Sequence, residues 1–185
     1  MSIPSAPWSW RAAYTKTDAV TWMISGAFGV AITTFVGQNY GAHKFYRVRQ
    51  SVRVCLGMSV CTVGVLSLTI VAFRSTILGI YTADSQVIET GSFIMSVIMP
   101  FAAVFMPVEI FAGTMRGMGD SVKPTVVICL SVCVVRVLWL ATVVRWHHAL
   151  VLLCVCYPMT WTLAAAIFLY IYFHNFRKRL VEEAQ

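Results

Sequence analysis

Two charged residues in otherwise apolar stretches are the side chains of this sequence best able to do chemistry. Glu109 lies in VIETGSFIMSVIMPFAAVFMPVEIFAGTM, and Arg136 lies near the middle of PTVVICLSVCVVRVLWLATVV. In a medium of low dielectric constant, a carboxylate must be protonated, paired or hydrated. Glu109 can therefore bind a proton or a sodium ion and exchange it for another cation. Its alternative role is purely structural, as one half of an ion pair.

The expected depth of Arg136 leaves two arrangements open. At about 1.5 Å per residue, Glu109 lies roughly 10 Å and Arg136 about 18 Å from the same end of their antiparallel stretches. The offset of about 8–9 Å allows a Glu109–Arg136 ion pair without requiring one. Otherwise Arg136 belongs to an interior polar network, in which we also place Gln38 and Asn39 from the end of the first apolar stretch.

Five apolar stretches position these groups, and each is about 20 residues or longer, the length with which a helix crosses a bilayer. The hydrophobic fraction is 59%, the mean hydropathy is +0.78 and only 11% of residues are charged. In lipid, backbone donors must be satisfied within their own segment, so the stretches should be helices. We expect an all-α, polytopic membrane bundle of five transmembrane helices. The stretches are Asp18–Gln38, Val54–Phe73, Val87–Met115, Pro124–Val144 and Ala149–Tyr172.

Two prolines interrupt the third stretch, whose start Asp84 or Ser85 can cap. Pro100 and Pro107 are seven residues apart and therefore share a helix face, and each removes a backbone donor. Membrane helices tolerate such breaks where neighbouring groups satisfy the freed carbonyls. We interpret the two prolines as a hinge that lets this helix bend.

Small residues recur at every fourth position of the first stretch and just beyond it, at Ser25, Gly29, Thr33, Gly37 and Gly41. This spacing is typical of helices whose backbones approach closely in lipid. We therefore expect this helix to pack against neighbours, and its polar groups either serve that packing alone or line a water-filled cavity.

Neither an enzymatic nor a metal site is expected. The six cysteines lie in apolar stretches without CxxC spacing, and the sequence has no Ser/His/Asp set. We therefore expect packing roles for the cysteines, no catalytic residues, no bound metal and no cofactor other than a coupling proton or sodium ion.

Lys and Arg residues are distributed unevenly between the two sides of the membrane that the five stretches would cross. Alternate loops and the C-terminal tail hold nine Lys and Arg residues, against four on the other side. Because Lys and Arg concentrate in cytoplasmic loops, we expect the N-terminus outside and the C-terminus in the cytoplasm. The net charge of +7 then reflects membrane topology, and nucleic acid is not an expected partner. The nine are Lys44, Arg47, Arg49, Arg53, Arg116, Lys123, Arg177, Lys178 and Arg179.

This topology divides the chain into three parts. Residues 1–17 form an outer N-terminal segment, residues 18–172 the transmembrane region and residues 173–185 a basic cytoplasmic tail. The expected location is a plasma membrane, of the bacterial inner-membrane type, which the chain crosses several times.

Three segments in the same order resemble the multidrug and toxic compound extrusion (MATE) transporters. FVGQNYGAHKFYRVR, with Gly37 and Gly41, resembles the loop after that family's eighth helix, and CVVRVLWL resembles its eleventh helix. PVEIFAGTMRGMGDSVKPT resembles the tenth helix and the loop after it, whose pattern is close to G-x-L-R-G-x-G-D-x-x-x-P. The resemblance covers about residues 12–172. The matching positions are Gly113, Arg116, Gly117, Gly119, Asp120 and Pro124, with Met115 in place of Leu.

The resemblance implies a fold of two six-helix lobes around a central cavity, in which protons or sodium ions are exchanged for hydrophobic or cationic small molecules. Glu109 is the residue to which the family's coupling role is carried over. The chain corresponds to helices eight to twelve, without the first lobe and the seventh helix. We therefore expect the C-terminal part of a drug antiporter, as a fragment, a split gene product or a decayed copy, with companion helices as partners.

Two other functions remain open. Related exporters of the same superfamily flip lipid-linked sugars, but such a protein should hold several basic residues in its cavity, and only Arg136 is deep here. The chain could instead be a non-transporting membrane scaffold that binds a partner through the small-residue face of its first helix.

Overall fold

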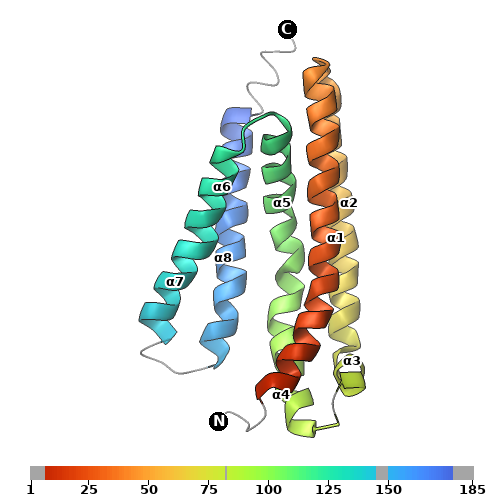
Figure 1. Cartoon of the computed structure of the whole chain (residues 1–185), viewed down its shortest axis with the longest axis vertical. Helices are drawn as coiled ribbons and strands as arrows, with labels where there is room; N and C mark the ends of the chain where they lie inside the picture. Colours follow the sequence, from red (N-terminus) through yellow and green to blue (C-terminus); the bar gives the residue numbers. More distant parts are fainter. Residues whose placement is uncertain (1–6, 82, 145–149, 177–185) are drawn as a thin grey trace.

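The computed structural model describes residues 7–81, 83–144 and 150–176, and it forms an up-and-down helical bundle (Figure 1). Within these residues all regular elements are helical, which confirms the predicted fold class. Five helical segments are long and apolar enough to cross a membrane: Thr15–Gly41, Phe45–Ala72, Ser85–Gly117, Val122–Val143 and Cys154–His174.

The first two helices extend beyond the predicted apolar stretches. The first helix, α1 (Pro7–Gly41), begins well before the predicted start at Asp18, so it includes part of the expected outer segment. The helix α2 (Phe45–Ala72) likewise includes three of the basic residues of the first predicted loop. The predicted start of the fifth stretch, Ala149, and most of the C-terminal tail lie outside the described residues.

The third span begins with a capped helix. The short helix α3 (Arg74–Tyr81) follows α2, and α4 (Ser85–Ile98) then starts the third span. The backbone N–H of Gln86 donates a hydrogen bond of 3.0 Å to the Asp84 side chain, which caps α4. Of the two residues that the sequence allows as the cap, the structure therefore uses Asp84.

The regular α-helix of the third span is interrupted at the first of its two prolines. A single 3₁₀ turn, Met99–Phe101, contains Pro100 and separates α4 from α5 (Ala102–Gly117). Pro100 is exposed, whereas Pro107 is half-buried inside the continuing helix α5. The first proline therefore coincides with the break in regular α-helix, and the second does not.

The helices α1 and α5 run in parallel and lie side by side (Figure 1). Gly113 and Gly117, one turn apart on α5, let the two backbones approach. A Cβ on Gly113 would lie 2.6 Å from Cγ2 of Ile32, and one on Gly117 would lie 2.6 Å from the carbonyl oxygen of Thr33. Both distances are too short for a side chain, so only glycine fits at these two positions.

The loop after α5 is a helix C-terminus of the Schellman type. The backbone N–H of Asp120 donates to the carbonyl of Met115 at 3.0 Å, and the N–H of Gly119 donates to that of Arg116 at 3.0 Å. Gly119 has φ = 87°, a conformation that glycine adopts without steric strain. The Asp120 side chain then accepts hydrogen bonds from the backbone and the ammonium of Lys123, which joins the end of α5 to α6 (Val122–Ile128).

The fourth span lies at the periphery of the bundle. It contains α6, a π-helical stretch (Cys129–Val134), α7 (Val135–Trp139) and a second π-helical stretch (Leu140–Val144). Only 6% of its most apolar part is buried within the chain, against 44% for the third span. The last helix, α8 (Leu150–Ile171), lies between this span and α5 and continues into a π-helical end, Tyr172–Phe176.

Replacing Gly113 by alanine should destabilise the bundle, because the new methyl group would force α1 and α5 apart. We expect Gly113→Ala to lower the free energy of unfolding by about 1–3 kcal/mol, the usual effect of overpacking. Thermal unfolding in detergent measures it. Gly26→Ala is the matched control, since nothing lies within 4 Å of a Cβ there. Equal stability of the two variants would contradict the close contact.

Candidate functional site

Glu109 lies on the face of α5 that contacts α1. Its side chain is half-buried, and a Cβ on Gly29 would lie only 2.7 Å from its Oε2 atom. The missing side chain at Gly29 thus leaves the space that the carboxylate occupies. Gly37 also faces α5, where a Cβ would lie 3.4 Å from the carbonyl oxygen of Gly117, whereas a Cβ on Gly41 would meet no atom within 4 Å.

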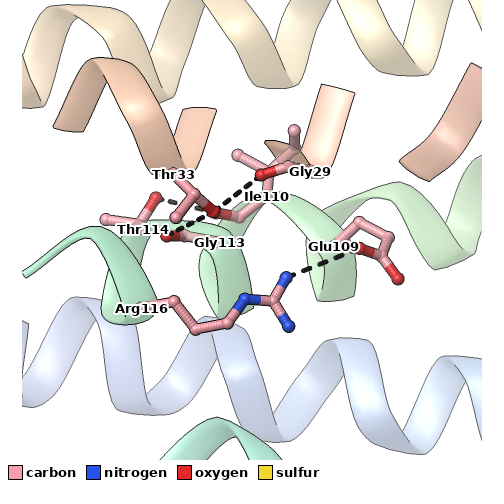
Figure 2. Close-up of polar contacts among 7 residues, drawn as sticks. All are labelled: Gly29, Thr33, Glu109, Ile110, Gly113, Thr114 and Arg116. Carbon is pink, nitrogen blue, oxygen red and sulfur yellow. Dashed lines mark hydrogen bonds and ion pairs between the residues drawn. The ribbon is translucent and has the colours of Figure 1, made fainter. Parts of the chain in front are cut away.

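The basic partner of Glu109 is Arg116, two turns further along α5 (Figure 2). Its Nη2 atom lies 3.8 Å from Oε2 of Glu109, which is an ion pair but is longer than a hydrogen bond. The Arg116 side chain is 38% exposed, so solvent or lipid headgroups compete with the carboxylate and the pair is weak. The Glu109–Arg136 pair that the estimated depths allowed is not formed.

The hydroxyl of Thr33 links α1 to α5 beside this carboxylate (Figure 2). Its Oγ1 atom lies 2.7 Å from the carbonyl oxygen of Gly29 in its own helix and 3.1 Å from that of Gly113 in α5. Because a hydroxyl has one proton, these two carbonyls share it. The close approach at Gly113 is what brings the second carbonyl within reach.

Arg136 lies away from this site, on α7, and its guanidinium contacts α8. Its guanidinium carbon is 4.2 Å from the centroid of the Tyr157 ring, and its Nη2 atom donates to the hydroxyl of Thr160 at 3.2 Å. The Nε atom is buried without a hydrogen-bond partner, and no carboxylate of the described ranges is within ion-pair distance of the guanidinium. A cation–π contact therefore takes the place of an anion.

The structure does not bring Gln38 and Asn39 to Arg136. Gln38 is exposed, and Asn39 is buried and donates to the carbonyl of Phe35 in its own helix at 2.8 Å. The interior network expected from the sequence is therefore not present as one cluster. Its members lie on α1 and α7, which are separated by α5 and α8 (Figure 1).

The loop motif has a structural explanation residue by residue. Gly117 permits the approach of α1, Gly119 ends α5 and Asp120 joins that end to α6. Arg116 is the exception, because it reaches back along the helix to Glu109 and does not extend into the loop. Its spacing of seven residues from Glu109, which places both on one helix face, is the signal that could have revealed the pair.

A wide apolar groove lies apart from these charged groups. It has a volume of about 530 Å³, lies between α1 and α2, and is lined mainly by apolar side chains such as Phe28, Phe35 and Met58. Glu109 and Arg136 are absent from its lining. Gly29 and Thr33 of α1 therefore serve the contact with α5 rather than this groove.

Metal ligands do not cluster in the described part of the chain. No group of three or more His, Cys, Asp or Glu side chains is placed to hold a metal ion there. The six cysteines are free thiols, with Cys154 and Cys156 buried in α8.

Five membrane-spanning helices, joined by short connections and carrying an acidic group at a helix contact, define a multi-pass α-helical membrane protein. Residues 12–142 match the family model MatE. Because that match covers most of the chain, the protein belongs to the MatE family.

Comparison with two known proteins shows what share of a relative's length this chain covers. The chain is 26% identical over 126 residues to "Probable multidrug resistance protein YoeA" of Bacillus subtilis (strain 168). The aligned region is 68% of this chain and 26% of that protein. It also resembles the solved structure of a multidrug resistance MATE family transporter of the MOP superfamily in an inward-facing conformation, with a TM-score of 0.64 and 13% identity. That likeness covers 90% of this chain and 40% of the other, and it supports the fold alone.

Removing the Thr33 hydroxyl should weaken the contact between α1 and α5. We expect Thr33→Val to lower the free energy of unfolding by about 0.6–1.7 kcal/mol, the range for hydrogen bonds between membrane helices. Unfolding in detergent measures the difference. Thr34→Val is the control, since its hydroxyl donates only to Val30 of its own helix. A stability no lower than that of the control would show that the bond to Gly113 contributes nothing.

Proposed function

We propose that this chain forms part of an antiporter that exports hydrophobic or cationic compounds in exchange for a proton or a sodium ion. Membership of the MatE family supports the transport role, and the relatives named above are described as multidrug resistance proteins. The observation that carries the coupling role is the half-buried carboxylate of Glu109 at the contact of two membrane helices.

Glu109 is suited to bind and release a cation because its basic partner holds it loosely. Among the described residues, Arg116 forms its one ion pair, at 3.8 Å. A proton or a sodium ion that binds the carboxylate removes the charge with which Arg116 interacts, and a partly exposed pair offers little resistance to this exchange. A tight, buried ion pair would instead keep the carboxylate permanently occupied.

The position of the carboxylate connects cation binding to helix packing. Oε2 of Glu109 occupies the space beside Gly29, so a change in its charge or in its bound cation alters the contact between α1 and α5. The 3₁₀ turn at Pro100 lies in the same span and provides a place where α4 and α5 can change their angle. Rocking of helix groups against one another is how transporters alternate access to a central site.

The remaining helices of the antiporter are proposed partners. The chain spans about a quarter of the curated relative's length and 40% of the solved transporter. We assign it to helices eight to twelve, in the second of two lobes, with companion helices completing the cavity. The sparse burial of the fourth span within this chain agrees with such an arrangement, because it leaves a large apolar face.

Neutralising Glu109 should abolish export without preventing insertion into the membrane. In drug-sensitive cells that express the whole transporter containing this chain, we expect Glu109→Gln to reduce ethidium efflux to the level of cells without transporter. Glu89→Gln is the control, since Glu89 is exposed near the start of α4. Normal efflux by Glu109→Gln, at equal membrane abundance, would remove Glu109 from the mechanism.

The uneven distribution of Lys and Arg predicts the orientation of the termini. In a variant whose six cysteines are replaced by alanine, we expect Ser2→Cys to react with a membrane-impermeant maleimide on intact cells, and Gln185→Cys to react only after the cells are broken. The reverse pattern would overturn the orientation.

A further inference from the structure

Two arginines of α2 line a pocket that lies apart from the proposed coupling site. The pocket has a volume of about 150 Å³ and lies between α2 and α8, which both pack on α5. Arg49 and Arg53 are four residues apart, which places them on one face of α2. Glu109 is absent from the lining, so the role of this pocket is a separate question.

Neither arginine is balanced by an acidic group among the side chains that the structure describes. The two ion pairs found there join Arg116 to Glu109 and Lys123 to Asp120. The Nε atom of Arg49 is buried and has no hydrogen-bond partner. Because buried polar atoms nearly always have a partner, this N–H points to an acceptor from outside the described part of the chain.

The two arginines lie where the hydrocarbon layer should end. Residues 54–72 of α2 carry no charge and extend about 28 Å by helix rise, close to the hydrocarbon thickness of about 30 Å. Arg53 directly precedes this stretch, and Arg49 lies one turn further out. Their guanidinium groups are therefore within reach of the lipid headgroups, at the end of the bundle where we expect the cytoplasm.

The remaining walls of the pocket are apolar and extend deeper into the membrane. Leu56 is seven residues beyond Arg49, or about 10 Å by helix rise, and Leu169 lines the pocket from α8. Phe111 of α5 lines it as well, and its ring centroid is 4.6 Å from that of Tyr172. The basic groups of the pocket thus lie on the headgroup side, and apolar side chains continue towards the middle of the membrane.

A phospholipid has the same order of groups, with a phosphate above hydrocarbon. A further helix is too wide for the pocket, because a helix with its side chains has a diameter of about 10 Å or more. A free phosphate ion fits poorly, since it would lose its hydration against mainly apolar walls. Basic pockets between membrane helices on the cytoplasmic side are a known kind of site for anionic headgroups.

We propose that Arg49 and Arg53, together with the apolar walls formed by Leu56, Phe111 and Leu169, bind one anionic phospholipid. The guanidinium groups donate hydrogen bonds to the phosphate, which supplies the acceptor that Nε of Arg49 lacks. The first carbons of an acyl chain lie against the apolar walls. The bound lipid joins α2 to α8 and stabilises their packing on α5. This proposal does not depend on the antiporter function or on Glu109.

Thermal unfolding of the 185-residue chain in a neutral detergent tests the proposal, with phosphatidylglycerol as the probe. A ligand that binds only the folded state raises the unfolding temperature. We expect a saturable rise with phosphatidylglycerol, and the same rise with phosphatidylcholine only at about tenfold higher lipid, because its own ammonium offsets the phosphate charge. Inorganic phosphate should have no effect. An equal rise with inorganic phosphate would assign the pocket to a free anion and overturn the proposal.

Substitution of single arginines separates the pocket from general charge attraction. Arg49→Gln and Arg53→Gln should each shift the midpoint of the phosphatidylglycerol response to about tenfold higher lipid, the loss of one charge-assisted contact. Arg47→Gln is the matched control, since Arg47 lines the wide groove beside α1 and not this pocket. An equal shift in the control would overturn the proposal. Arg53 is exposed, so Arg53→Gln decides if Arg49→Gln does not fold.

The C-terminal tail is the competing occupant, because Glu182 and Glu183 follow the pocket residue Phe173 in the sequence. Replacing both glutamates by glutamine should leave the response to phosphatidylglycerol intact. If the unaltered chain does not respond and this double variant does, the tail occupies the pocket and the proposal is wrong. The absence of any response in both chains would overturn it as well.

Discussion

The parallel contact between α1 and α5 is the constraint on which the other features depend. Lipid provides no hydrophobic drive for helices to associate, so their stability in a bilayer comes from close packing and interhelical hydrogen bonds. Gly113 and Gly117 supply the close packing, and Thr33 supplies the hydrogen bond to Gly113. The same approach sets the carboxylate of Glu109 against Gly29. The helix contact and the candidate site therefore lie in the same part of the molecule, between α1 and α5.

The features that follow from local sequence could be predicted. The five spans are evident because a helix needs a long, mainly apolar stretch to cross hydrocarbon, and the structure places a helix on each. The four-residue spacing that includes Gly29 and Thr33 marks the packing face of α1. The N-cap at Asp84 could likewise be predicted, because capping depends on residues adjacent in the chain.

The pairing of side chains between helices could not be predicted in the same way. Depth estimates place Glu109 and Arg136 near one another along the membrane normal, but they carry no information on how each helix is rotated. The structure turns Arg136 toward Tyr157 on α8 and leaves Glu109 to Arg116 of its own helix. The unsatisfied hydroxyl of Thr21 could not be predicted either. The sequence does not distinguish a threonine whose hydroxyl donates to its own helix from one whose hydroxyl has no hydrogen-bond partner.

The two π-helical stretches of the fourth span affect the direction in which its side chains point. A π-helical turn holds more residues than an α-helical one, because its hydrogen bonds reach one residue further along the chain. Each residue in such a stretch therefore advances the helix through a smaller angle. Arg136 lies in α7, between the two π-helical stretches. The direction in which its side chain points, relative to either end of the span, therefore depends on these wider turns as well as on the number of residues. A helical wheel drawn at 3.6 residues per turn would consequently misplace the direction of the guanidinium relative to the ends of the span.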